Sequence, residues 1–163
     1  MASAGGTPGY ELPLLLFGGF RAIIDELHAE LARRGHPDLR PAHGFVMQAV
    51  GLQGATATEV GGRLGISKQA AGKTIDRLEA LRYVTRAGDA ADRRRKLVRL
   101  TPHGLAALAE SAAIFTDIRD RWARELGPGH VEGLEACLRQ MVPDGVFRLD
   151  VPGWLGTSYL TGT

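Results

Sequence analysis

The sequence has very little of what disulfide-bonded, membrane-spanning or secreted proteins need. Among its 163 residues there is one cysteine, Cys137, which excludes an internal disulfide and a cysteine-based metal cluster. It contains no run of 18 apolar residues, so we expect no membrane-spanning helix and no membrane partner. The short apolar patch near the N-terminus has no basic residue before it, unlike a secretory signal. These absences predict a cytoplasmic protein.

Sequence patterns typical of catalysis are also missing. There is no Gly-rich phosphate loop, no HExxH pattern and no locally supported Ser/His/Asp arrangement. A tetrahedral metal site needs three or four convergent ligands. The histidines are instead scattered, at His28, His36, His43, His103 and His130. We therefore predict that the protein is not an enzyme, with no catalytic residues, no cofactor and no metal site.

The positive charge of the chain is concentrated in its centre. Residues 63–101 hold eleven Lys/Arg and four Asp/Glu, a net charge of +7. The whole chain carries only +2, so the remainder is at −5. A basic centre flanked by acidic segments is typical of a module that binds a polyanion, although a basic solvated surface would give the same count.

Helical periodicity dominates both ends of the chain. From Leu12 to Arg34 apolar residues recur every three or four positions, which predicts an amphipathic helix with a stripe of Leu16, Phe20, Ile23, Ile24, Leu27 and Leu31. A second helix is expected from Pro41 to about Leu52. After the centre, a long helix is expected over 102–126 and a final one over 130–141.

The central part of the chain predicts two short helices followed by two strands. We expect Thr58 to cap the first helix and Ser67 the second, with Gly65 at the turn between them. Two helices joined at a glycine turn form a helix-turn-helix, whose second helix buries a stripe of Ala71, Ile75, Leu78 and Leu81. Residues 84–86 and the alternating segment 96–100 then predict a β-hairpin, or wing.

The face of the second helix opposite its buried stripe is small and polar. It carries Gln69, Gly72, Lys73 and Asp76, with Lys68 and Arg77 at its edges. A major groove admits such a helix, and Gln and Lys can reach base edges there. Ser67 is placed where a helix N-terminus can meet a phosphate. A glycine inside a helix costs about 1 kcal/mol relative to alanine, so Gly72 indicates either close approach of DNA or a permissive surface site.

This order of elements resembles the multiple-antibiotic-resistance regulator (MarR) family over about Leu12 to Met141. The segment TEVGGRLGISKQAAGKTIDRLEALRYVTR carries the helix-turn-helix, and DAADRRRKLVRLTPHG carries the wing. The wing is the more specific part, since it pairs an Asp-x-Arg loop with a following Leu-Thr-x-x-Gly. Here those residues are Asp92, Arg94, Leu100, Thr101 and Gly104.

The resemblance implies a homodimeric DNA-binding regulator, expected to be a repressor. Its double-stranded operator would be pseudo-palindromic. The recognition helix, 67–82, would enter a major groove and the wing, 84–100, a minor groove. Arg94 would insert there, Asp92 would hold the wing arginines, and Arg93 and Arg95 would serve phosphates. The expected fold is mainly α with a small β-wing.

The resemblance also implies a division of the chain. We expect a flexible N-terminus (1–10), a helical dimerisation region (11–36 and 102–142), a winged helix-turn-helix lobe (41–101) and a C-terminal tail (143–163). The alternative is a winged helix used for protein contact or dimerisation without DNA binding. Affinity for duplex DNA that falls steeply with salt would distinguish the two.

Many relatives respond to a small phenolic or acidic ligand. The resemblance implies that such a ligand would lie between the dimerisation helices and the lobe, where Phe17, Arg21, His43 and Met47 are candidates. The alternative is that Phe17 and Met47 belong to the core.

Three positions depart from the family pattern or its mechanisms. Arg82 stands where a glycine usually closes the recognition helix, so the end of this helix is expected to differ. Gly61 and Gly62 replace alanine in the preceding helix, which would loosen it or allow close packing. Cys137 lies in the last helix, far from the N-terminal position of oxidant-sensing relatives, and is expected to be a buried structural thiol.

Overall fold

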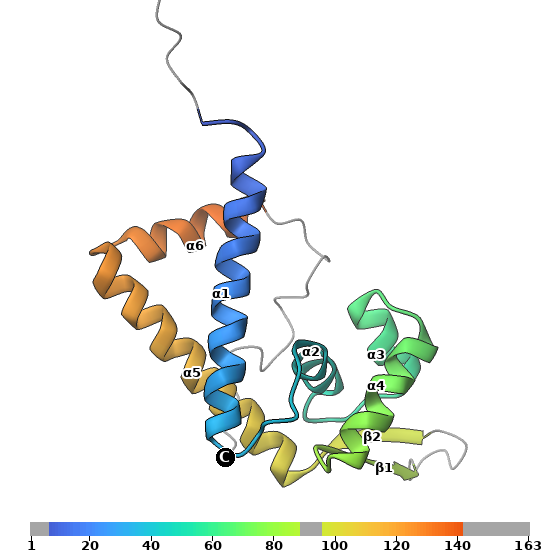
Figure 1. Ribbon diagram of the computed structural model, residues 1–163. Coiled ribbons are helices and arrows are strands. Elements are labelled where there is room, and N and C mark those ends of the chain that lie inside the picture. Colours follow the sequence, from blue (N-terminus) through green and yellow to red (C-terminus); the bar gives the residue numbers. More distant parts are fainter. Residues whose placement is uncertain (1–6, 89–95, 142–163) are drawn as a thin grey trace, which may run out of the picture.

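Six helices and one two-stranded antiparallel sheet form the part of the chain that this computed structural model describes, residues 7–88 and 96–141 (Figure 1). The mainly α fold with a small β-wing is therefore confirmed. In chain order the elements are α1 (Glu11–Arg33), α2 (Pro41–Val50), α3 (Ala57–Leu64), α4 (Lys68–Ala80), β1 (Val84–Gly88), β2 (Lys96–Leu100), α5 (Pro102–Leu126) and α6 (His130–Met141).

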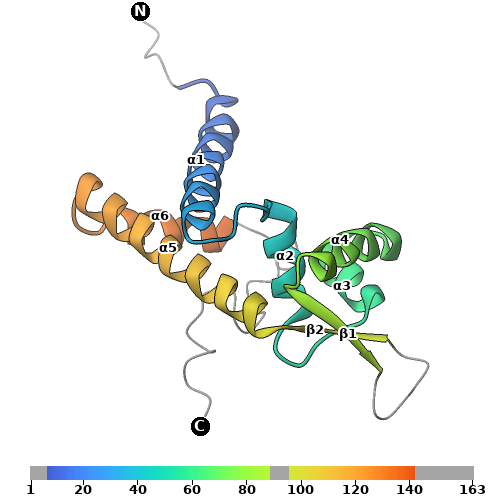
Figure 2. The ribbon, with the colours of Figure 1, turned by 60° about the horizontal axis from the view of Figure 1, so that its bottom comes forward.

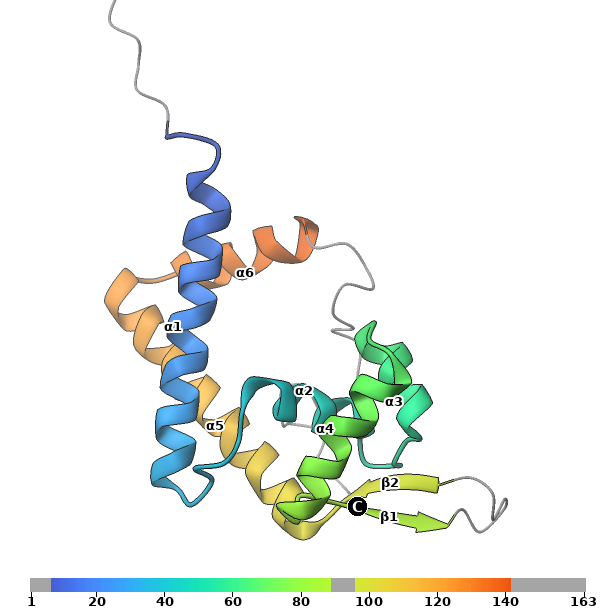
Figure 3. The same ribbon diagram turned by 45° about the vertical axis from the view of Figure 1, so that its right-hand side comes forward.

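The first helix and the last two form one side of the molecule. Helix α1 packs against α5, and α6 turns back from the end of α5 (Figures 1 and 3). Two arginines of α5 join these helices. Arg121 makes a bidentate ion pair with Glu26 of α1 at 2.6 and 2.7 Å, and Arg119 holds Glu135 of α6 at 2.7 Å.

The other side is a lobe of α2, α3, α4 and the two strands. Helices α3 and α4 pack on α2, and the strands extend from the lobe as a hairpin (Figure 2). The strands pair from Val84 with Leu100 to Gly88 with Lys96. Ala55 adds a third, single-residue edge through two backbone bonds to Val98, at 2.9 and 3.0 Å. Sequence patterning does not predict this edge, because one residue is too short to show alternation.

A continuous apolar core joins the two sides. Its centre lies in the lobe, where Val46, Met47, Val60, Ile75, Leu78, Val84 and Val98 are almost fully buried. It continues into Leu27 and Leu31 of α1 and Ala107, Leu108 and Ile114 of α5. Burial of this surface is the main favourable term for the fold. Because one core serves both sides, the lobe is held firmly on α5.

Helix α3 begins two residues earlier than the sequence indicated. Thr56, and not Thr58, is the N-cap: its Oγ1 accepts from the amide of Glu59, whose carboxylate accepts in return from the amide of Thr56. This reciprocal pair is a capping box, which satisfies two amides that the helix leaves unpaired. A cap at Thr58 would place Glu59 at the first helical position, too close to the cap to form this reciprocal pair. The capping box therefore favours Thr56 as the N-cap.

Arg82 takes the left-handed conformation that the sequence argued against. Its φ is +64°, and the amides of Arg82 and Tyr83 donate to the carbonyls of Glu79 and Leu78. This is the Schellman ending of a helix, normally closed by glycine. The expectation of a different helix end was therefore wrong. The hydrogen bonds offset a conformational cost of roughly 1–2 kcal/mol.

The Thr-x-x-Gly pattern after β2 has a direct steric reason. Thr101 caps α5 by accepting from the amide of Gly104, and its hydroxyl lies 2.6 Å from the carbonyl oxygen of Arg82. A Cβ at position 104 would lie 2.1 Å from the carbonyl oxygen of Tyr83. Only glycine therefore lets α5 start this close to the end of α4.

Much of the apolar stripe of α1 is not buried. Leu27 and Leu31 enter the core, but Leu16 and Phe20 are exposed, as are Leu12, Leu14, Leu15 and Phe17. Cys137 of α6 is exposed too, so the expected buried thiol was wrong. Over the ranges 7–88 and 96–141, no helix is long and apolar enough to cross a bilayer.

Candidate nucleic-acid interface

Helix α4 divides its residues as the sequence predicted. Ala71, Ile75 and Leu78 are fully buried against α2 and α3, while Leu81 is half-buried. The opposite side exposes Lys68, Gln69, Lys73, Asp76 and Arg77. The lobe therefore presents one polar helix face to the outside, next to the strands of the wing (Figure 3).

The start of α4 is suited to an anion. Ser67 is the N-cap, with its Oγ accepting from the amide of Ala70 at 3.1 Å, and it is exposed. Free amides at a helix N-terminus attract a phosphate group. At Gly72 a Cβ would meet nothing within 4 Å. Gly72 thus has open space before it, which agrees with both interpretations of this residue.

Asp76 and Glu79 are joined to the wing by an arginine. In β1, Arg86 makes an ion pair with Asp76 at 2.5 Å and a second one with Glu79, and its backbone amide donates to Glu79 at 2.9 Å. The sequence placed Asp76 on the open face of α4 and missed Arg86. The only signal was a basic residue inside a short strand, and strand alternation does not identify its partner.

A basic hollow lies between α3, α4 and the strands. Its volume is about 380 Å³, and Lys68, Arg86 and Lys96 line it together with Thr56 and Thr58. Among these five residues, the sequence predicted only Lys68 as a DNA contact. Lys96 and Thr56 come from elements far apart in the chain, so only the folded hairpin brings them together.

Four candidate residues of the wing lie outside the described residues. They are Asp92, Arg93, Arg94 and Arg95, between the ends of β1 and β2. The described residues on either side of them, Gly88 and Lys96, pair at the outer end of the hairpin. The roles of the four candidate residues remain predictions from the family resemblance.

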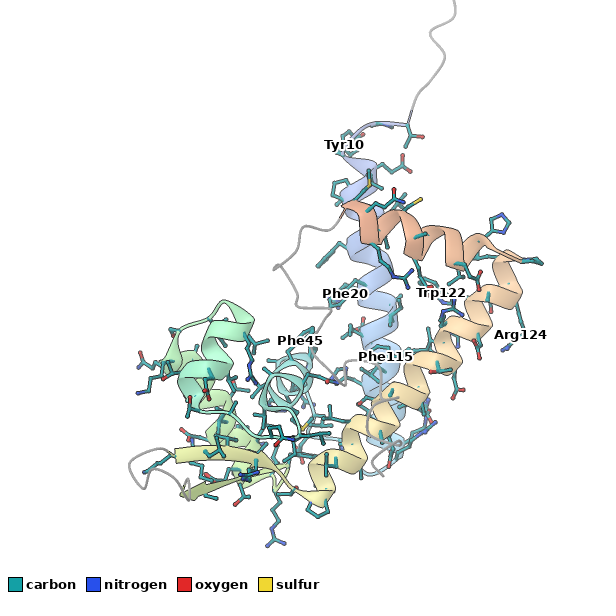
Figure 4. All side chains as sticks on the ribbon, turned by 180° about the vertical axis from the view of Figure 1, so that it is seen from behind. Tyr10, Phe20, Phe45, Phe115, Trp122 and Arg124 are labelled. Atoms are coloured by element: carbon teal, nitrogen blue, oxygen red, sulfur yellow. The ribbon has the colours of Figure 1, made fainter. Side chains whose placement is uncertain are left out.

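The four candidate ligand residues do not line one cavity. A small cavity of about 60 Å³ lies between α1, α2 and α5, and Met47 lines it. Phe45 of α2 and Phe115 of α5, both labelled in Figure 4, line it as well. Phe17 and Arg21 lie on the exposed part of α1 outside this lining. Met47 is fully buried, as the alternative of a core residue implied, whereas the same alternative does not fit the exposed Phe17.

The third of these candidates, His43, is buried and serves α2. Its Nδ1 accepts from the amide of Arg40 at 3.2 Å, at the start of the helix. Burial, followed by the positive charges of Arg40 and Arg77, lowers the pKa of His43 below its usual value. A neutral ring is therefore favoured, because burial and these two positive charges outweigh the opposing effect of Asp38.

A second polar cluster ties the lobe to α5. His36 is buried, with Nδ1 2.8 Å from the hydroxyl of Tyr83 and Nε2 3.8 Å from a carboxylate oxygen of Glu110. His103 stacks on Tyr83 at 4.4 Å. The sequence showed these as scattered histidines. In the part of the chain that is described, no three His, Cys, Asp or Glu residues are placed to hold a metal ion.

The comparisons with known proteins point to one family. The model of the MarR family matches residues 38–95, which include the helix-turn-helix and the start of the wing. No curated protein matches the chain.

Solved structures of MarR-type regulators have the same fold. The reduced form of MarR from E. coli is 24% identical, with a TM-score of 0.68, over 81% of this chain and 96% of that one. A cysteine-to-serine mutant of MarR from E. coli, complexed with operator DNA, is 23% identical, with a TM-score of 0.65, over 82% and 94%. MepR from Staphylococcus aureus, a transcription regulator of the multidrug efflux pump MepA, is 19% identical, with a TM-score of 0.64, over 83% and 96%. The match over residues 38–95 and the shared fold show a winged helix protein whose central segment is similar to the MarR family.

Proposed function

We propose that the protein is a transcription regulator that binds double-stranded DNA in a sequence-specific manner in the cytoplasm, and that it is a repressor. The observation that carries this proposal is the exposed polar face of α4 beside a basic hollow and a hairpin. Ser67, Lys68, Gln69, Gly72, Lys73 and Arg77 supply the contacts of the recognition helix in a major groove. The wing contributes Asp92, Arg93, Arg94 and Arg95, with Arg94 in the minor groove.

The active form in this proposal is a homodimer on a pseudo-palindromic operator. Six large apolar side chains are exposed on the first half of α1: Leu12, Leu14, Leu15, Leu16, Phe17 and Phe20. An exposed apolar patch of this kind is typical of a protein interface. The division into a dimerisation region, a DNA-binding lobe and a tail belongs to this proposal.

Release by a small phenolic or acidic ligand is a second part of the proposal. The cavity between α1, α2 and α5 supports it, because Oε1 of Gln48 is buried there without a hydrogen-bond partner in the described residues. At about 60 Å³ this cavity holds only a few water molecules. An aromatic ligand must therefore displace side chains such as Phe45 and Phe115, which would couple binding to a movement of α2 against α5.

DNA binding is tested by selecting duplexes from a random pool and measuring affinity for the selected sequence at increasing salt. Several phosphate contacts predict that the logarithm of the affinity falls steeply and linearly with the logarithm of the salt concentration.

Arg94→Ala should weaken binding to the selected duplex at least tenfold, about 1.4 kcal/mol, with unchanged thermal unfolding. Arg124→Ala removes the same charge on α5, away from the lobe (Figure 4), and should have little effect. Absence of binding to any duplex at low salt would favour the protein-contact alternative.

A further inference from the structure

Arg86 is the one described wing residue that ion-pairs with the recognition helix. Its guanidinium bridges Asp76 and Glu79, which lie one helical turn apart on the same face of α4. The backbone amide of Arg86 also donates to Glu79 at 2.9 Å. The side chain of Arg86 is only 28% exposed, so the bridge is partly shielded from water. Such a forked contact has a fixed geometry, unlike the contact of a lysine.

This bridge restrains the hairpin against α4. Arg86 is the central residue of β1 and pairs with Val98 of β2, so both strands follow its position. The other end of β1 is fixed through Tyr83, at the end of α4. The backbone bonds of Val98 to Ala55 hold β2, and the Arg86 bridge adds a side-chain anchor that sets the direction of β1 against α4. The direction of β1 in turn determines where the outer end of the hairpin lies relative to the open face of α4.

The same bridge changes the charge that this surface presents. Asp76 is 70% exposed on the side of α4 that carries Gln69 and Lys73. An unpaired carboxylate there would repel DNA phosphates. Arg86 places a positive charge between the two carboxylates and shares the basic hollow with Lys68 and Lys96. It therefore acts on both the geometry and the potential of this surface.

We propose that Arg86 is a positioning residue for DNA recognition, which sets the wing at the angle needed for simultaneous contact with the groove read by α4 and the groove beside it. Asp76 is then a partner of Arg86 and not a base-reading residue. This proposal rests on the proposed DNA binding. Phosphate and wing contacts fix the register of a protein on the duplex, and register decides which bases the helix meets.

The proposal separates two quantities that a purely electrostatic role would change together. One is affinity for a scrambled duplex, which follows net charge. The other is the ratio of affinities for the selected and the scrambled duplex, which requires correct register. Arg86→Lys keeps the charge but loses the fork. Arg86→Met removes one positive charge, and the double change Asp76→Asn with Glu79→Gln removes two negative ones.

Competition binding with selected and scrambled duplexes of equal length gives the test. We expect all three variants to lower the affinity ratio about tenfold. Affinity for scrambled DNA should stay level for Arg86→Lys, fall for Arg86→Met and rise for the double variant. Arg121→Met breaks a comparable arginine pair, with Glu26 in the helical region, and should leave both quantities unchanged.

Two results would overturn the proposal. If Arg86→Lys and the double variant keep the full affinity ratio, Arg86 contributes charge alone. If urea unfolding shows that only variants with a lower midpoint lose the ratio, Arg86 is a general stabilising residue. A wild-type protein that binds every duplex with equal affinity, or none, would reject the proposed function itself, and this positioning role with it.

Discussion

His43 is a single residue whose surroundings predict a pH dependence of stability. It is buried at the start of α2, and burial lowers its pKa in the folded protein. In the unfolded chain its pKa returns to the ordinary value near 6.5. Below pH 6.5 the unfolded state therefore binds more protons than the folded one, and this imbalance destabilises the folded protein.

We therefore expect the free energy of unfolding to fall as the pH is lowered from about 7.5 through 6.5 toward the lower pKa of folded His43. Glutamine at position 43 can still accept from the amide of Arg40 but cannot be protonated. His43→Gln should reduce the decrease in the urea midpoint over this range. Because the other histidines are common to both proteins, the difference between the two pH curves isolates His43. If the urea midpoints of the wild-type protein and of His43→Gln changed in parallel with pH, the prediction would be wrong.

At the scale of one element, two adjacent glycines of α3 have different reasons to be there. The carbonyl of Gly61 accepts from the amide of Ile66 across the turn, at 3.0 Å, and a Cβ at position 61 would lie 2.8 Å from the carbonyl oxygen of Ile66. A Cβ at Gly62 would meet nothing within 4 Å. The close packing considered from the sequence is therefore present at Gly61, while Gly62 is available for a side chain.

The neighbouring positions give a matched pair of substitutions. Gly61→Ala should destabilise the protein by about 1–3 kcal/mol, the usual cost of forcing extra volume into a packed site. Gly62→Ala should stabilise it by up to about 1 kcal/mol, the difference in helix propensity. Urea unfolding of both variants measures the two values. If Gly61→Ala were neutral, the turn between α3 and α4 would be more adaptable than its contacts indicate.

For the whole molecule, the exposed half of α1 is the surface that the proposed homodimer would bury. Phe17 is 61% exposed and Phe20 is 47% exposed, on a helix whose other half enters the core. In a monomer these apolar side chains of α1 are exposed to water. A second copy would bury them, at a gain of roughly 25 cal/mol for each Å² removed from water.

Charged residues on this surface should therefore give a monomer. We expect Leu16→Glu with Phe20→Glu to halve the mass measured by light scattering at micromolar concentration, and to weaken operator binding. Leu52→Glu makes the same change at a leucine that is 52% exposed between α2 and α3, and should leave the mass unchanged. A wild-type protein that is already monomeric would contradict the dimer.

The sequence by itself determined the order and type of the elements. Each helix has enough apolar periodicity to be recognised locally, and most helix boundaries carry a Gly, Pro or hydroxyl residue, with the end of α4 at Arg82 as an exception. The buried stripe of Ala71, Ile75 and Leu78 could be read in this way, because the period of a helix fixes which residues share a face. The family match also rests on such local patterns, over residues 38–95.

Only the tertiary structure decided which side chains meet across elements. The bridge from Arg86 to Asp76 and Glu79, the contact of His36 with Tyr83 and the edge formed by Ala55 join elements by packing, and no local pattern encodes them. Tertiary hydrogen bonds also overrode local preference at Arg82, which accepts a left-handed conformation because its neighbours complete the helix end. Local propensities are worth tenths of a kcal/mol to about 1 kcal/mol per residue, and a few such contacts outweigh them.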